Sequence, residues 1–180
     1  MNKNLLLLAL LLILIVTPRT SYSQSHPQID HTKIEHFITI LVAESAKLKV
    51  IADDVLEISD LYSDKWEQIF MVNIAEYLDK IKTHYEYNAV ILGIGSGKYV
   101  EDNDKLDFYV NLVRPMFKSA NHKIGTAYEQ MKVMYGLITN KSALHSIDKA
   151  KDSISSTLQL YGKFIELLTT YERQYQESRQ

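Results

Sequence analysis

The chain has 180 residues and a formal net charge of −2, with 20 lysine and arginine residues interspersed among 22 acidic ones. This balance provides no basic stripe of the kind that nucleic-acid binding needs, so we expect no nucleic-acid partner. The chain has no cysteine, which excludes disulfide bonds and a lipid anchor on an amino-terminal cysteine. Its stability must therefore come from the packing of a core.

The amino-terminal segment has the pattern of a signal peptide. An unbroken apolar run covers residues 5–16 and is about a dozen residues long, well short of the ~20 residues that cross a bilayer as a helix. Ser21 and Ser23 are small residues that a signal peptidase accepts. We therefore predict a cleaved signal peptide over residues 1–23 and export to the periplasm, the cell surface or the extracellular space. An uncleaved anchor is the alternative, because Arg19 follows the apolar run closely.

The mature chain has the size of a single domain. Cleavage leaves about 157 residues beginning at Gln24, enough to bury a core without cross-links. Residues 25–28 are polar and include a proline, so we expect a flexible lead-in over residues 24–29. Residues 30–176 carry helical patterns and are predicted to form one helical-bundle domain, followed by a polar tail at residues 177–180.

Two helices are predicted in the first half of this domain. Asp30 is a candidate N-cap for the first helix, and the segment 59–64 is a predicted turn whose Asp64 caps a second helix from about Lys65. Apolar residues recur at steps of three and four along both helices. The first stripe contains Ile34, Ile38, Leu41, Leu48, Ala52 and Val55, and the second contains Met71, Ile74, Leu78, Ile81 and Tyr85, flanked by Trp66, Phe70 and Tyr77.

Three glycines then predict the end of the second helix. Gly93, Gly95 and Gly97 fall within five residues, and each costs a helix about 1 kcal/mol relative to alanine, so we expect a loop as far as about residue 103. A third helix is predicted over residues 104–139. Pro115 lies inside it without shifting the phase of its stripe, so we expect a kink there rather than two separate helices. The stripe contains Leu106, Val110, Val113, Phe117, Ala120, Ile124, Ala127, Met131, Met134 and Ile138.

A fourth helix completes the predicted fold. Asn140 is expected to close the third helix, and a tight connection from Lys141 leads into the last one, whose stripe contains Leu144, Ile147, Ile154, Leu158, Tyr161, Ile165 and Leu168. Short links make consecutive helices antiparallel. The sequence therefore predicts an all-α fold, an elongated up-down four-helix bundle. The alternative is an open pair of long helical hairpins whose apolar faces are covered by a partner or a second copy.

The glycine cluster invites comparison with a phosphate-binding loop, and the comparison fails. That loop needs a glycine where this chain has Leu92 and a serine or threonine where it has Tyr99. We therefore interpret the segment as a helix C-cap and loop. The stretch from Val90 to Ile94 is the most apolar of the mature chain, and it is a candidate for contact with a membrane or a partner at a hairpin tip.

No group of residues predicts catalysis, a cofactor or a metal. Of the histidines, only His31 has a partner at helical ligand spacing, Glu35, and two ligands do not make a site. His84 is expected to be a boundary imidazole. The acidic residues Asp53, Asp54 and Glu57 are expected to form a solvated face. Serines at positions 153, 155 and 156 lack the motif that accompanies acyl chemistry, so no small-molecule substrate is indicated.

Tyrosines lie beside several of the stripes, where a ring can be buried while its hydroxyl reaches water or a partner. They are Tyr77, Tyr109, Tyr128, Tyr135 and Tyr161. Long, cleanly patterned helices offer surface rather than a pocket. We therefore expect a non-enzymatic exported bundle that binds a protein partner or itself, as a periplasmic or surface component of a larger envelope assembly. The alternative is a membrane-active protein that inserts residues 90–94 into lipid.

Overall fold

The structure is a computed structural model that describes residues 29–97, 100 and 102–177. All regular structure in these residues is helical, which confirms the all-α prediction. The elements are α2 (His31–Asp60), α3 (Lys65–Ser96), α4 (Asp102–Asp107), the π-helix η1 (Phe108–Val113), α5 (Arg114–Tyr135) and α6 (Lys141–Glu177). The predicted signal peptide, all but the last residue of the lead-in and residues 178–180 of the tail lie outside the described residues.

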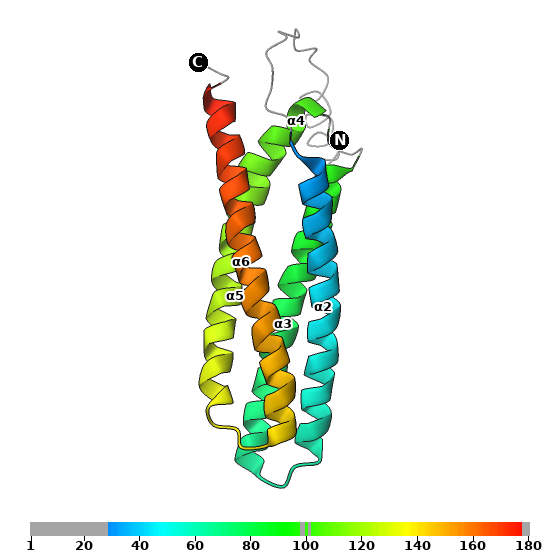
Figure 1. Ribbon diagram of the computed structural model, residues 1–180, viewed down its shortest axis with the longest axis vertical. Helices are drawn as coiled ribbons and strands as arrows, with labels where there is room; N and C mark the ends of the chain where they lie inside the picture. The colour runs from blue at the N-terminus through cyan, green and yellow to red at the C-terminus, as the bar shows by residue number, and fades with distance from the viewer. Residues whose placement is uncertain (1–28, 98–99, 101, 178–180) are drawn as a thin grey trace, which may run out of the picture.

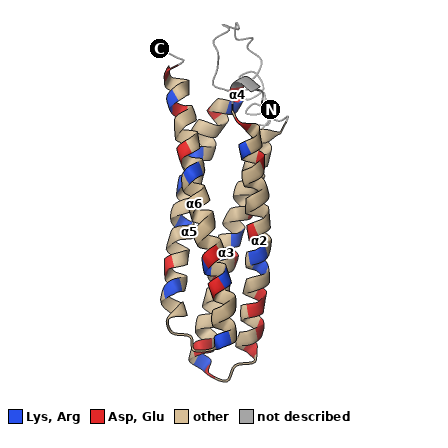
Figure 2. Ribbon diagram, viewed as in Figure 1, with Lys and Arg blue, Asp and Glu red and all other residues tan. Residues whose placement is uncertain are grey.

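The helices form an elongated bundle in which neighbours run in opposite directions (Figure 1). In chain order, α2, α3, α5 and α6 pack as a ring, since α2 contacts α3, α3 contacts α5, α5 contacts α6, and α6 returns to α2. Loops 61–64 and 136–140 lie together at one end, which we call the closed end; we call the other the open end. Both signs of charge occur along the full length of the bundle (Figure 2).

The predicted N-caps of the first two helices are present. The Asp30 carboxylate accepts a hydrogen bond from the backbone N–H of Lys33 at 3.2 Å. The Asp64 carboxylate accepts from the N–H groups of Trp66 and Glu67, at 2.8 and 3.2 Å. Each cap satisfies amides that have no partner within their helix, and these local bonds explain why the two helices begin where the sequence indicates.

The prediction that Asn140 closes the third helix is wrong. That helix ends at Tyr135, and Gly136 follows as its C-cap. Asn140 instead begins the next helix, because its side-chain oxygen accepts from the N–H groups of Ser142 and Ala143, both at 3.0 Å. An asparagine suits either end of a helix, so the residue type alone does not distinguish the two roles.

The core is shared by all four long helices and has an aromatic centre. Phe37 of α2 stacks on Phe164 of α6 at 4.6 Å between ring centroids, and Phe117 of α5 lies 5.3 Å from Tyr161 and 5.1 Å from Phe164. Every residue of the second predicted stripe is buried. Of the first stripe, Ile38 is only partly buried, and of the third and fourth, so are Ala127, Met134, Leu144, Leu158 and Ile165.

The expected loop from Gly93 is wrong, because α3 continues through Gly93 and Gly95 to Ser96. Gly95 is buried against the ring of Phe108, and a Cβ atom at this position would lie 2.5 Å from that ring. The glycine therefore permits a close approach between α3 and η1. Only Gly97 acts as the C-cap, and its N–H bonds the carbonyl of Gly93 at 3.1 Å.

The third predicted helix is present as three consecutive helical segments, α4, η1 and α5. The N–H of Arg114 bonds the carbonyl of Tyr109, five residues back, which is the bond of a π-helix. Pro115 follows as the second residue of α5, just beyond this wider turn. Proline has no N–H and crowds the carbonyl four residues earlier, so a wide turn before it removes that conflict. In Figure 1 the first part of this three-part helix, beginning with α4, slants across the open end of the bundle.

Candidate interaction surface

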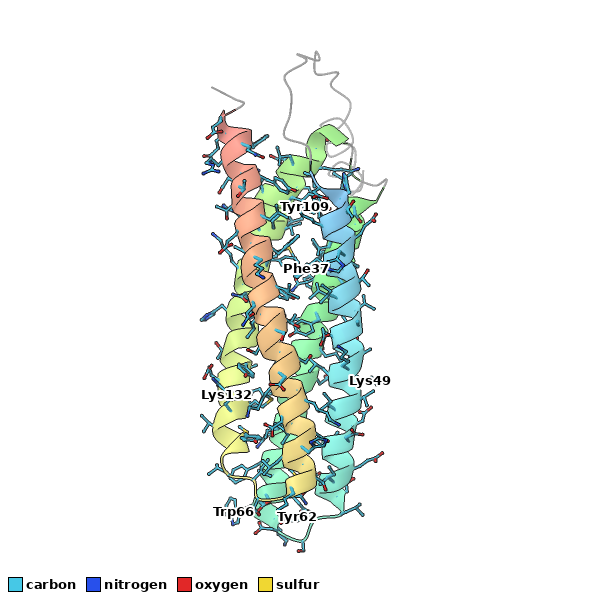
Figure 3. All side chains as sticks on the ribbon, viewed as in Figure 1. Phe37, Lys49, Tyr62, Trp66, Tyr109 and Lys132 are labelled. Carbon is cyan, nitrogen blue, oxygen red and sulfur yellow. The ribbon has the colours of Figure 1, made fainter. Side chains whose placement is uncertain are left out.

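Exposed apolar side chains surround the closed end of the bundle, where α3 begins and α5 ends. Their exposed fractions are 89% for Leu61, 71% for Trp66, 49% for Ile69, 71% for Val133 and 52% for Leu137. We call these five residues the closed-end cluster. Figure 3 shows Trp66 at this end of the molecule. Because α3 and α5 pack against each other, the cluster spans both helices and the two loops.

Trp66 is exposed because it lies off the buried stripe of α3. Glu67 and Met71 face the interior, and successive residues of a helix point about 100° apart, so the residue before Glu67 is turned away from the core. The backbone of Trp66 is nevertheless held in place, since its N–H bonds the Asp64 cap at 2.8 Å. The result is a large aromatic ring on a fixed backbone and in contact with solvent.

Glu67 joins the two loops of the closed end. Its buried carboxylate accepts hydrogen bonds from the hydroxyl and the N–H of Thr139, at 2.5 and 3.1 Å, and from the N–H of Asn140 at 3.3 Å. A buried carboxylate is tolerated when its oxygens are satisfied in this way, and the first turn of a helix favours negative charge. The first turn of α3 is therefore tied directly to the loop between α5 and α6.

A second set of bonds holds the loop between α2 and α3. The side-chain amide of Gln68 donates to the carbonyls of Ser59 and Tyr62, at 2.9 and 2.5 Å. With both loops held by side chains from the start of α3, the closed-end cluster rests on a constrained scaffold. Such preorganisation lowers the entropy lost when a surface binds a partner.

The segment from Val90 to Ile94 is not a loop but lies within the last two turns of α3. Leu92 is fully buried and Ile91 packs against the core, whereas Val90 and Ile94 are 60% and 41% exposed. Tyr87, 55% exposed, lies one turn before Val90 on the same outer face. The most apolar stretch of the sequence is thus divided between core and surface. We call Tyr87, Val90 and Ile94 the α3 strip.

The residues considered for metal binding do not come together. Within the described ranges, no three histidine, aspartate or glutamate side chains are grouped so that they could hold a metal ion. His84 is half-buried, and burial together with the charge of Lys123 lowers its pKa. Asp53, Asp54 and Glu57 are exposed on α2. Of the glycine segment that was compared with a phosphate-binding loop, Gly93 and Gly95 are helical, and Lys98 lies outside the described residues.

Two of the tyrosines expected at the edge of the core are inside it. Tyr109 and Tyr161 have no exposed surface, and burial raises the pKa of both hydroxyls. Asn88 of α3 donates a hydrogen bond to the Tyr161 hydroxyl at 2.7 Å across the bundle. The other three, Tyr77, Tyr128 and Tyr135, are partly buried as expected. Tyr109 lies in η1, whose wider turn changes the direction of side chains in a way that a simple heptad pattern does not predict.

The three serines singled out on α6 lie at or near the surface. Ser153 and Ser155 are partly buried, and Ser156 is exposed. Ser153 donates a hydrogen bond to the carboxylate of Glu44 on α2, and Glu44 also pairs with Lys47 at 2.5 Å. Ser153 therefore connects α2 and α6.

Sequence patterning named only Trp66 from the closed-end cluster, and placed it beside the second stripe. The available signal was a tryptophan two residues after the N-cap Asp64 and out of phase with that stripe.

In the part of the chain that the structure describes, none of the helices combines the length and the apolar character needed to cross a membrane. Compared with known protein families, with curated proteins and with solved structures, the chain matches none of them.

Proposed function

We propose that this chain is an exported, non-enzymatic helical bundle that acts by binding another protein, as a component of a larger assembly in the periplasm or at the cell surface. The observation that carries the proposal is the closed-end cluster with its exposed tryptophan. Tryptophan is enriched among the residues that dominate the energy of protein interfaces, and exposed apolar groups gathered on a rigid support are typical of binding surfaces.

The test compares two exposed aromatic residues on the same helix. Trp66→Ala removes the aromatic ring of the closed-end cluster, and Tyr87→Ala removes another exposed ring toward the far end of α3. Tagged wild-type and variant chains are used to recover proteins from envelope extracts of the native host, followed by quantitative mass spectrometry. We expect partners recovered by the wild type and by Tyr87→Ala to be depleted at least tenfold with Trp66→Ala. Equal recovery by all three chains would contradict the proposal.

Export is supported by the leader pattern of residues 1–23 and is tested separately. Mass spectrometry of the protein from its native host should give an amino terminus at or within a few residues of Gln24. A full-length mass in the membrane fraction would show an uncleaved anchor and would remove export as a soluble component from the proposal.

The second candidate function is membrane insertion through the α3 strip, favoured by the exposure of Val90 and Ile94 close to the end of α3. Val90→Asp should abolish co-flotation with liposomes if this function holds. Val90 is a better probe than Ile91, which packs against the core and whose substitution would also disturb folding. Val42→Asp, a comparably exposed valine on α2, provides the matched control.

A further inference from the structure

A groove runs along the seam between α2 and α6. Its part nearer the middle of the bundle has a volume of about 610 Å³ and includes Ile51 and Thr157 in its lining. A second part of about 470 Å³ continues to Leu61 at the closed end, and Asp54 lines both. Small side chains on α6 leave this space open: Ser142, Ser146, Ser153 and Ser156.

The two walls of the groove carry opposite charges near the closed end. The α2 wall presents Asp54 and Glu57 there, and the α6 wall presents Lys141. Acidic positions are visible along the lower part of α2 in Figure 2. Among the ion pairs of the described residues, none joins these two walls. Both walls therefore offer charges to whatever covers the groove.

Nearer the middle of the bundle both walls carry mixed charges. Glu44 and Lys47, which pair with each other, line the groove from α2, and Lys149 and Asp152 line it from α6. The hydrogen bond from Ser153 to Glu44 fixes the register of the two antiparallel helices, and in that register Glu57 lies about level with Lys141. Taken over the whole lining, the α2 wall has more acidic than basic residues (Glu44, Asp54 and Glu57 against Lys47), and the α6 wall has more basic than acidic ones (Lys141 and Lys149 against Asp152).

From this pattern we infer that the α2–α6 groove is the contact surface between two copies of this chain, packed face to face with their closed ends together. A twofold axis parallel to the bundle places α2 of each copy over α6 of the other at the same level. The acidic α2 wall of one copy then faces the basic α6 wall of the second, and Glu57 meets Lys141, this contact occurring twice. An antiparallel arrangement would instead place α2 against α2 and lose this match.

The size of the face is at the lower end of the range for stable dimers. From Ile40 to Leu61 the α2 wall is roughly 30 Å long at 1.5 Å per residue, and two helices of about 10 Å diameter give a face of roughly 600 Å² per copy. Typical stable interfaces bury about 800 Å² per partner, and the smallest about 600 Å². The exposed Val50 near the middle of the face, and Ile40 and Leu160 at its far end, add apolar contact between the charged positions.

The test reverses the charges on one wall of the groove at a time. Dimerisation of each purified chain is then measured by sedimentation velocity over about 1 to 100 μM. Asp54→Lys with Glu57→Lys makes both walls basic near the closed end, and Lys141→Glu with Lys149→Glu makes both acidic. We expect the wild type to dimerise and each reversed chain alone to dimerise at least tenfold more weakly. An equimolar mixture of the two should form a heterodimer, because only that pair restores opposite charges on both contacts.

Glu76→Lys with Asp79→Lys is the matched control, since it makes the same change of charge on the exposed face of α3 and should leave the dimer intact. Circular dichroism and melting establish that each variant is folded. A wild type that is monomeric throughout, reversed chains that remain dimeric, or a mixture that fails to form the heterodimer would each overturn the inference. Trp66→Ala should still dimerise, so this result is independent of the proposed binding at the closed end.

The orientation can be tested because the chain contains no cysteine. A chain carrying Glu57→Cys is mixed with a chain carrying Lys141→Cys and oxidised. The twofold arrangement predicts a disulfide between the two different chains and little between identical ones. Cross-linking mainly between two Glu57→Cys chains would place α2 against α2 and exclude the parallel dimer.

Discussion

The middle of the bundle and its closed end use aromatic residues in opposite ways. Phe117 and Tyr161 have no exposed surface and pack in one aromatic centre, whereas Trp66 is 71% exposed. Both regions are held by polar bonds, from Asn88 in the middle and from Glu67 at the end. The difference indicates that the middle determines stability, while the closed end keeps a large ring outside the fold and available for contact.

The largest expected effect is in the middle of the bundle. Phe117→Ala should lower the free energy of unfolding by ~3 to 5 kcal/mol, because it removes a fully buried ring and leaves a cavity beside Phe37 and Phe164. Urea denaturation measures the change. Lys118→Ala, on the next and exposed residue, should cost less than about 0.5 kcal/mol. Equal effects of the two substitutions would mean that the rotation of α5 is wrong.

The next effect concerns the buried hydrogen bond. Asn88→Ala should cost about 1 to 3 kcal/mol, because the buried Tyr161 hydroxyl would lose its partner. Tyr161→Phe should show a similar cost by leaving the Asn88 amide unsatisfied. The double change Asn88→Leu with Tyr161→Phe should cost less than the sum of the two single changes. Strict additivity in urea melts would show that the pair is not coupled.

A smaller effect is expected from the polar bonds of the closed end. Glu67→Gln keeps the shape of the side chain but removes its charge, and it should cost about 1 kcal/mol by weakening the bonds to Thr139 and Asn140. Glu76→Gln, on the exposed face of the same helix, is the control and should change stability by less than about 0.5 kcal/mol. Thermal melting of the two variants measures the difference. Equal melting temperatures for Glu67→Gln and Glu76→Gln would contradict a stabilising role for the Glu67 carboxylate.

The smallest effect on stability is expected at the exposed ring itself. Trp66→Ala should change the free energy of unfolding by less than about 0.5 kcal/mol, since little surface of Trp66 is buried. Trp66 is also the only tryptophan in the chain, so intrinsic fluorescence reports on it alone. Acrylamide should quench the native emission nearly as well as that of the unfolded chain. Strong protection in the isolated protein would show that the ring is covered.

Properties that belong to a single helix could be predicted from the sequence. The caps at Asp30 and Asp64 depend on side chains bonding to amides two or three residues away, and the apolar stripe of α3 depends only on helical periodicity. The candidate surface was much less predictable. Trp66 was recognised only as a neighbour of the stripe, and the α2–α6 groove was not predicted.

What lies between helices was decided only by the tertiary structure. Gly95 stays helical because Phe108 from η1 occupies the place of its missing side chain. Tyr109 is buried because a π-helical turn precedes Pro115 and redirects it, and Asn140 caps α6 because α5 ends early. Periodicity and capping are local and act within a few residues. The rotation and register of each helix against its neighbours depend on contacts between residues far apart in the chain, and those contacts determine which side chains reach the surface.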